Sequence, residues 1–206
     1  MCGRYFFGDR TADEVEKELG LRPGSISPRP GDATPGMILP GIVRRRNAAK
    51  APDAQSCDNE SQATDVRDLF WGLTSRDNKL IINARAESVC DKPMFSDSFL
   101  SRRCLLPAAG FYEWDKAKTK FIFKRPDGKP MYLAGFYDLN EGKDSFVILT
   151  TMANKSMEPV HDRMPVMIEA ASAQDYLQDT SAAMDMLKEP MPELERSTGY
   201  EQLSLF

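Results

Sequence analysis

A series of short apolar segments separated by turn residues is the feature that most constrains how this chain can fold. Segments rich in β-branched and aromatic side chains occupy residues 104–114, 120–124, 131–137, 146–151 and 163–168. Pro126-Asp127-Gly128 and Asn140-Glu141-Gly142 separate neighbouring segments and are typical of hairpin turns. The pattern predicts an antiparallel, barrel-like sheet, which makes the fold α+β with β dominant.

The remainder of the chain predicts shorter elements around this sheet. Thr11–Glu14 has the pattern of a capping box, and Ser96, Ser172 and Thr180 are expected to begin short peripheral helices. Further strands are expected at residues 3–7, 37–43, 70–73 and 79–84, with loops at 22–36 and about 44–67. Because no repeat or compositional break interrupts the chain, we expect a single domain over residues 1–206 with a tail at about 198–206.

Composition limits the classes of function. The chain has no apolar segment of membrane-spanning length and no secretory signal, which favours a cytoplasmic protein without membrane partners. Its four cysteines are scattered, so neither a disulfide framework nor a structural zinc site is expected, and no metal or cofactor is assigned. The net charge of −4 means that any contact with nucleic acid needs a local basic patch.

The second residue offers unusual chemistry. If Met1 is removed, Cys2 carries a thiol and a free α-amine on adjacent carbons. Their reference pKa values are about 8.5 and about 7.7–8.0, so both have a nucleophilic fraction near neutral pH. Such a 1,2-aminothiol condenses with an aldehyde to give a five-membered thiazolidine. The alternative is that cysteine stands at position two by chance.

Three other polar residues stand out from apolar surroundings. Asn83 follows the apolar segment Leu80–Ile82, where a turn or cap residue is the ordinary interpretation. Glu113 lies among aromatic residues; it is either a proton donor whose pKa burial raises or a solvent-facing residue of an alternating strand. His161 is the only histidine, and the ordinary interpretation is a surface residue paired with its neighbours. Together with Cys2 these groups suit one aldehyde condensation.

The chain resembles the SRAP family, the SOS response-associated peptidases or abasic-site processing proteins. The resemblance spans residues 1 to about 168 and rests on segments in family order. These segments are Met1–Tyr5, Trp71-Gly72, Ile82–Glu87, Arg103–Pro107, Gly110–Trp114, Leu149–Thr151 and His161–Pro165. Two departures are the segment Gly31–Pro35, where family members often have Tyr-Asn-x-Ala-Pro, and a short spacing between Trp71 and Asn83. The first puts a DNA contact from that loop in doubt.

The resemblance implies a DNA-repair activity and, with it, a nucleoid-associated location. Cys2, freed of Met1, would trap the ring-opened aldehyde of an abasic site in single-stranded DNA as a covalent thiazolidine that shields the lesion. Asn83 would orient the α-amine, Glu113 would act as general acid and base, and His161 would bind the opened sugar. The residues expected to contact DNA are Arg4, Arg85, Thr150 and Arg163 at phosphates, and Trp71 and Trp114 at bases. Self-removal of Met1 and a further lyase activity are also implied.

Other functions are compatible with parts of the pattern. An N-terminal cysteine also serves glutamine amidotransferases and related amidohydrolases, and Cys2 with His161 could form a thiol peptidase. The last residues resemble a bacterial sliding-clamp-binding motif, in which an extended tail fills an apolar groove. The residues of that motif are Gln202, Leu203, Leu205 and Phe206. The alternatives are that this tail is an edge strand of the domain, or that the whole protein is a non-catalytic clamp accessory.

Overall fold

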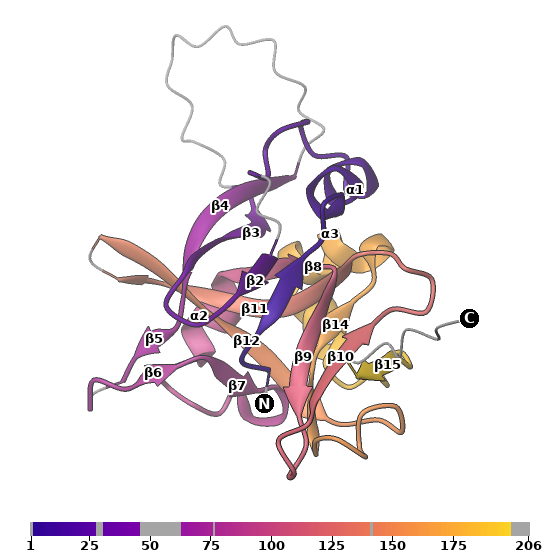
Figure 1. The fold of residues 1–206 in the computed structure, drawn as a ribbon. Helices are drawn as coiled ribbons and strands as arrows, with labels where there is room; N and C mark the ends of the chain where they lie inside the picture. Colours follow the sequence, from indigo (N-terminus) through magenta and orange to yellow (C-terminus); the bar gives the residue numbers. More distant parts are fainter. Residues whose placement is uncertain (1, 28–30, 46–62, 76, 141, 199–206) are drawn as a thin grey trace, which may run out of the picture.

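Five strands form a closed ring in the computed structural model (Figure 1), which describes residues 2–27, 31–45, 63–75, 77–140 and 142–198. The ring runs β12–β4–β3–β8–β11 and returns to β12. Its strands are β3 (Ile38–Arg44), β4 (Thr64–Trp71), β8 (Arg103–Ala108), β11 (Met131–Asn140) and β12 (Lys143–Met152). Neighbours are antiparallel except β12 and β4, which pair in parallel. The predicted barrel-like, β-dominant fold is therefore confirmed.

A second sheet covers one side of the barrel. Its order is β15–β10–β9–β1–β2, and every pairing is antiparallel. The strands are β1 (Tyr5–Phe7), β2 (Gly31–Ala33), β9 (Gly110–Trp114), β10 (Lys120–Lys124) and β15 (Glu195–Thr198). Only Ala109 separates β8 from β9, so the segment predicted as one strand passes from the barrel into the second sheet. The strands β2 and β15 were not predicted.

Short strands extend the barrel beside β12. The strand β7 (Asn83–Arg85) pairs in parallel with it, and β13 (Arg163–Pro165) pairs with its last residues. The strand β14 (Met167–Ile168) joins β11, and β5 (Leu73–Thr74) pairs with β6 (Leu80–Ile81) in a separate hairpin. As a result, β12 aligns two segments that carry predicted site residues, one on β7 and one just before β13.

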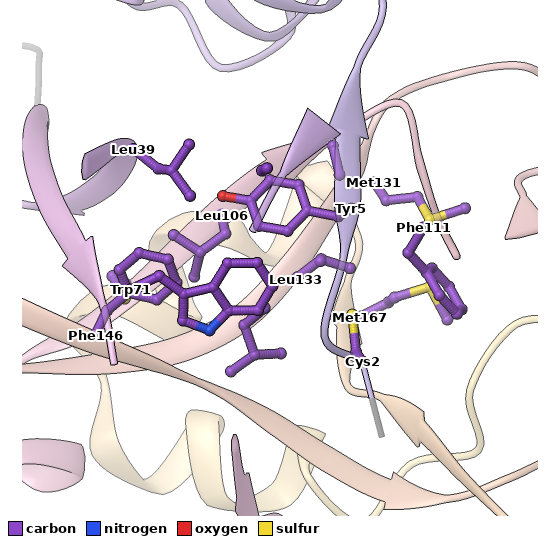
Figure 2. Close-up of a cluster of buried hydrophobic side chains, with 14 of the residues drawn as sticks. Cys2, Tyr5, Leu39, Trp71, Leu106, Phe111, Met131, Leu133, Phe146 and Met167 are labelled. Atoms are coloured by element: carbon purple, nitrogen blue, oxygen red, sulfur yellow. The ribbon is translucent and has the colours of Figure 1, made fainter. Parts of the chain in front are cut away.

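Four of the barrel strands, β3, β8, β11 and β12, are largely buried on both faces, which explains their mostly apolar sequences, whereas β4 is polar and partly exposed. One cluster fills the barrel and the space beneath the second sheet, and includes Tyr5, Trp71 and Phe146 (Figure 2). The other lies between the barrel wall and the helices, and includes Phe99 and Tyr176. Residues that alternate along β8, β11 and β12 fall into different clusters, as the two-residue period of a strand requires.

The helices are short and peripheral, as expected. They are α1 (Thr11–Glu18), α2 (Ser96–Ser101), α3 (Ala173–Gln178) and α4 (Thr180–Met186), with 3₁₀ turns at Ala86–Ser88 and Ala170–Ser172. The helices α2 and α4 begin at Ser96 and Thr180, as predicted, although α2 has no side-chain cap at its N-terminus. The capping box at Thr11–Glu14 was wrong, because Thr11 is the first helical residue and its hydroxyl accepts the Gly8 N–H.

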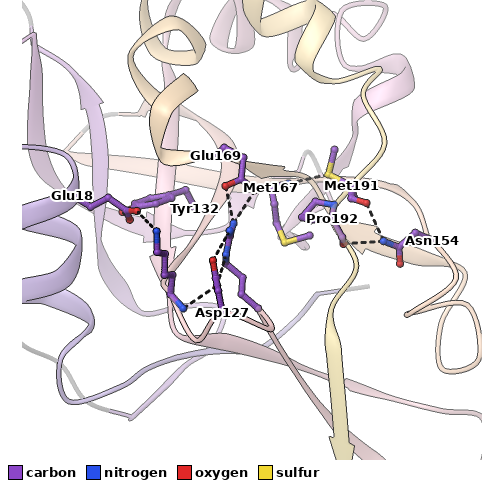
Figure 3. A network of polar contacts seen from close by, with 10 residues as sticks. Glu18, Asp127, Tyr132, Asn154, Met167, Glu169, Met191 and Pro192 are labelled. Carbon is purple, nitrogen blue, oxygen red and sulfur yellow. Dashed lines mark hydrogen bonds and ion pairs between the residues drawn. The ribbon is translucent and has the colours of Figure 1, made fainter.

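Polar contacts fasten the helices and the C-terminal segment to the barrel (Figure 3). The Tyr132 hydroxyl on β11 donates to Glu18 on α1 at 2.6 Å. The Asn154 amide donates to the carbonyl oxygens of Met191 and Pro192, which leads the chain toward β15. Both ends of the segment predicted as a loop at 44–67 belong to strands, because β3 extends to Arg44 and β4 starts at Thr64, and residues 46–62 lie outside the described residues. Among the helices of the described residues, none is long and apolar enough to cross a membrane.

Candidate active site

Cys2 enters the protein interior just before β1. Its side chain is 1% exposed and belongs to the cluster that fills the barrel (Figure 2). The strand β1 is hydrogen-bonded to β2 on one side and β9 on the other. Cys2 therefore has a fixed position at the start of a strand within a sheet.

Asn83 holds the backbone of Cys2. Asn83 is the first residue of β7 and lies opposite Ile148 of β12. Its Nδ2 donates to the Cys2 carbonyl oxygen at 3.1 Å. Its Oδ1 is buried and accepts no hydrogen bond from any residue that the structure describes. This pairing joins two of the predicted site residues and leaves an acceptor beside the N-terminus.

Glu113 lies on the inner side of the second sheet. It is 5% exposed, whereas its neighbours Tyr112 and Trp114 are on the opposite side of β9 and are more accessible. Its Oε2 accepts the Trp114 backbone N–H at 3.4 Å. The solvent-facing alternative for Glu113 is thus excluded by its burial.

The Cys2 thiol and the Glu113 carboxylate interact electrostatically. The pKa of the Cys2 thiol is raised to about 12, chiefly because burial disfavours the thiolate and secondly because the Glu113 charge is close. A hydrogen bond from the Arg4 backbone acts in the opposite direction. Cys2 is therefore a neutral thiol in the electrostatic field of the Glu113 carboxylate.

His161 lies on the segment between β12 and β13 and is partly exposed. Its Nδ1 accepts the backbone N–H of Arg163 at 3.0 Å, and the Asp162 Oδ1 lies 2.9 Å from the same nitrogen. The Arg163 backbone and the Asp162 side chain therefore both contact the same ring nitrogen of His161. Val160, next to it, belongs to the same buried cluster as Cys2. The histidine segment thus reaches the cluster that holds the thiol.

Two of the predicted DNA contacts lie at the surface close to Glu113. The Arg4 guanidinium lies 5.7 Å from the centre of the Trp114 ring and pairs with Asp32 at 3.4 Å. Trp114 is 36% exposed. Arg85, at the end of β7, is also exposed, so these three side chains remain available to a ligand.

Trp71 and Thr150 are core residues, and the predicted contacts with DNA from these side chains are wrong for this structure. Trp71 is 0% exposed, packs between Tyr5 and Phe146, and donates its indole N–H to the Ile82 carbonyl at 3.1 Å. Thr150 is also buried on β12. Neither side chain is exposed enough to contact a base or a phosphate.

Arg163 is bound within the protein. Its guanidinium makes two hydrogen bonds with the Glu87 carboxylate, at 2.7 and 2.8 Å, and a third with the Thr150 carbonyl at 2.6 Å. The Arg163 guanidinium, which was expected to bind a phosphate, is thus paired with the Glu87 carboxylate. Glu87 was part of the motif Asn83–Glu87 but received no role, because its partner lies far away in the sequence. The ion pair connects the Asn83 segment to the His161 segment.

The predicted clamp-binding motif lies outside the part of the chain that the structure describes. Its residues are Gln202, Leu203, Leu205 and Phe206. Within the residues that are described, no three histidine, cysteine, aspartate or glutamate side chains gather in a way that could hold a metal ion.

Comparison with protein families identifies the chain. The family model described as SOS response associated peptidase (SRAP) matches residues 1–201. The chain belongs to this family. Among curated SRAP-like relatives, the abasic site processing protein YoqW of Bacillus subtilis is 32% identical over 206 residues, covering 91% of this chain and 85% of that protein. The abasic site processing protein YedK of Escherichia coli is 25% identical over 193 residues, covering 86% and 79%.

The fold is shared with a solved structure of distant sequence. A phage-related protein from Bordetella bronchiseptica superposes with a TM-score of 0.75 at 21% identity, covering 97% of this chain and 95% of that chain. At this identity the similarity concerns the fold alone. It shows that the barrel and second sheet are an arrangement shared across distant sequences.

Proposed function

We propose that this SRAP protein recognises abasic sites in single-stranded DNA and links to them covalently through Cys2 after Met1 is removed. Two findings support the proposal. The chain belongs to a family whose curated relatives are named abasic site processing proteins. Cys2, Asn83 and Glu113 are joined by a hydrogen bond and an electrostatic interaction.

The reaction uses the aldehyde of the ring-opened deoxyribose. The freed α-amine of Cys2 attacks C1′, and loss of water gives an imine. The Sγ atom then attacks the same carbon as its proton passes through Glu113 to the imine nitrogen, which closes a thiazolidine. The balance is one aldehyde and one aminothiol giving one thiazolidine and one water. Because the thiol pKa is about 12, Glu113 must accept the proton as the C–S bond forms.

The observation that carries the proposal is the Asn83 side chain. Its Nδ2 fixes the Cys2 carbonyl, and its buried Oδ1 accepts no hydrogen bond from the described residues. A buried acceptor of this kind costs free energy unless a donor satisfies it. The α-amine of processed Cys2 would be such a donor, and this hydrogen bond would orient the amine for attack.

A crosslinking experiment tests the proposal. The processed protein is incubated with single-stranded DNA carrying one abasic site, and a heat-stable adduct is measured on a denaturing gel. We expect the adduct to disappear in Cys2→Ala, to form more slowly in Asn83→Leu and Glu113→Gln, and to persist in the matched control Cys90→Ala. Absence of an adduct with wild-type protein whose N-terminus is verified as Cys2 would refute the proposal.

We further propose that the chain removes its own Met1 and that a lyase activity accompanies the crosslink. Mass spectrometry of Met1-bearing protein incubated alone tests the first activity. Self-removal predicts loss of one methionine in the wild type and its retention in Glu113→Gln. For the second, β-elimination from the imine would expel the 3′ phosphate, so the gel would show a shortened strand. An intact strand with full adduct would exclude the lyase activity.

The alternative nucleophilic functions of Cys2 predict different products. An amidotransferase-like enzyme would release ammonia from glutamine, and a thiol peptidase would cleave an added peptide in a reaction that requires His161. Assays for ammonia and for peptide cleavage therefore separate these activities from crosslinking. Turnover of either substrate without an adduct would favour that alternative.

The C-terminal motif supports a second proposal, that residues 202–206 dock on the replicative sliding clamp. Its order of residues, with Gln202 followed by Leu203, Leu205 and Phe206, matches a groove-binding peptide. A pull-down with purified clamp should fail for Leu203→Ala with Phe206→Ala and succeed for the matched control Ser204→Ala. Unfolding of the double variant, or unchanged binding, would contradict docking by the tail.

A further inference from the structure

The outer side of the second sheet carries a row of aromatic rings. Residues at alternate positions on β9 face away from the barrel, which places Tyr112 and Trp114 on this side. Phe6 on β1 pairs with Gly110, and its ring approaches the place where a side chain at Gly110 would stand. The Phe6 and Tyr112 ring centres are 5.0 Å apart. The three rings therefore follow the line of β9, with strand positions about 6.7 Å apart.

Each of these rings has a cation next to it. The Lys120 Nζ lies 3.8 Å from the centre of the Tyr112 ring, and the Lys124 Nζ lies 5.6 Å from that of Phe6. The Arg4 guanidinium has the corresponding position at Trp114, 5.7 Å from the ring centre. Aromatic faces with adjacent cations match the bases and phosphates of a single strand, because rings stack on bases and cations neutralise phosphates.

The charge on this side is locally positive in a chain of net charge −4. Lys116 and Lys118 add two exposed cations on the hairpin between β9 and β10. The acids on this face each have a cation beside them: Asp32 pairs with Arg4, and Glu195 lies opposite Lys124 across β15 and β10. A local patch of this kind is what nucleic-acid binding requires of an acidic protein.

We propose that Phe6, Tyr112, Lys120 and Lys124 form a track that binds undamaged single-stranded DNA next to the lesion, without base specificity. The track rests on the proposed function, because it begins at Trp114, adjacent to Glu113, and leads away from the reactive thiol. It gives the protein an affinity for the strand that does not depend on the aldehyde. Stacking and phosphate contacts tolerate any sequence, as lesions at arbitrary positions require.

Binding of lesion-free oligothymidylate of about 16 nucleotides, followed by fluorescence anisotropy, tests the track. Lys120→Gln with Lys124→Gln should weaken binding and reduce the slope of log affinity against log salt by about 1.4, two contacts at about 0.7 each. Lys17→Gln with Lys188→Gln is the matched control, because it removes two exposed lysines that lie away from the second sheet and should leave both quantities unchanged.

Variants at Tyr112 separate stacking from charge. Tyr112→Leu should weaken oligothymidylate binding by about 5- to 100-fold, whereas Tyr112→Phe, which keeps the ring, should retain it. Wild-type affinity and salt slope in the lysine and leucine variants would overturn the track. A change in oligomeric state without a change in DNA binding would overturn it also, because the face would then be an interface between copies.

The test distinguishes this proposal from the crosslinking chemistry. On an abasic trinucleotide, whose single flanking nucleotides extend no farther than the Trp114 end of the track, the lysine double variant should form the adduct at close to the wild-type rate. On a long abasic strand at limiting concentration it should form the adduct more slowly. Failure of all adduct formation together with lysine-dependent oligothymidylate binding would refute the proposed chemistry and leave the track supported.

Discussion

The ion pair between Arg163 and Glu87 makes a quantitative prediction for the variant Glu87→Gln. The carboxylate binds the guanidinium through two hydrogen bonds, at 2.7 and 2.8 Å. The Arg163 side chain is 10% exposed and the Glu87 side chain is 46% exposed. Glutamine keeps the shape of the side chain and one acceptor oxygen, so the substitution removes the charge and one hydrogen bond while leaving the packing in place.

The magnitude follows from the unequal exposure of the two partners. Breaking a fully buried pair costs about 3–5 kcal/mol, whereas an exposed pair contributes about 0–1 kcal/mol. Here the arginine is largely desolvated and the glutamate is half in water. We therefore expect Glu87→Gln to lower the free energy of unfolding by about 1–3 kcal/mol at pH 7. With a urea m-value of about 2 kcal/mol/M, the midpoint falls by roughly 0.5–1.5 M.

The effect should depend on pH in a definite direction. Hydrogen bonds with Arg163 lower the pKa of the Glu87 carboxyl in the folded state. The stabilisation is fully present above the unfolded pKa of about 4.3 and is lost as the pH falls through the folded value. The difference between wild type and Glu87→Gln should therefore be constant from pH 7 to about pH 5 and shrink below about pH 4.

Urea unfolding followed by circular dichroism measures the difference. The matched control is Glu14→Gln, which breaks the exposed pair with Arg10 and should shift the midpoint little. Because the Arg163 backbone N–H holds the His161 ring, the variant should also form the DNA adduct more slowly. A midpoint equal to that of the wild type at pH 7 would show that Arg163 does not depend on Glu87.

Three further predictions concern the core and the thiol. Gly110→Ala should destabilise the protein by about 1–3 kcal/mol in urea, because the new Cβ would lie 2.6 Å from the Phe123 carbonyl oxygen, whereas Gly8→Ala meets nothing closer than 3.4 Å and should cost less. The pKa of the Cys2 thiol is about 12 in the folded protein and about 8.5 in the unfolded chain. The stabilisation that this difference provides is complete below about pH 8.5 and is lost as the pH rises toward 12. Above about pH 8.5, the wild type should therefore lose free energy of unfolding relative to Cys2→Ala. In single-tryptophan variants, iodide and oligothymidylate should quench Trp114 fluorescence and leave Trp71 unaffected, and quenching of Trp71 would contradict its burial.

Most of the barrel could be predicted from the sequence because β3, β8, β11 and β12 are largely apolar on both faces, whereas the first half of the polar strand β4 was expected to be a loop. Segments such as Met131–Tyr137 carry this signal without reference to distant residues. The strands β2 and β15 could not be predicted, because Gly31–Ala33 and Glu195–Thr198 are short and polar edge strands. Their pairing depends on neighbours elsewhere in the sequence, β1 and β10, and not on their own composition.

The candidate site shows a related limit. Cys2, Asn83 and Glu113 could be singled out because a thiol, an amide and a carboxyl in apolar surroundings need partners. The same reasoning fails for Trp71 and Thr150, because an indole and a hydroxyl satisfy their single donors with a nearby carbonyl and then pack in a core. A motif therefore marks such residues as important without saying whether they face the ligand or support the fold.

The position of β12 explains why residues proposed for the reaction and residues that stabilise the fold occur in the same motifs. Asn83 on β7 pairs with one residue of this strand, and β13, which follows His161, pairs with its end. Glu87 and Arg163 then join the two flanking segments across β12. We therefore expect a substitution that weakens this ion pair to change the position of Asn83 relative to His161, although neither side chain is altered. The motifs Asn83–Glu87 and His161–Pro165 thus each combine a residue that we propose for the reaction with a residue of the ion pair that joins the two segments.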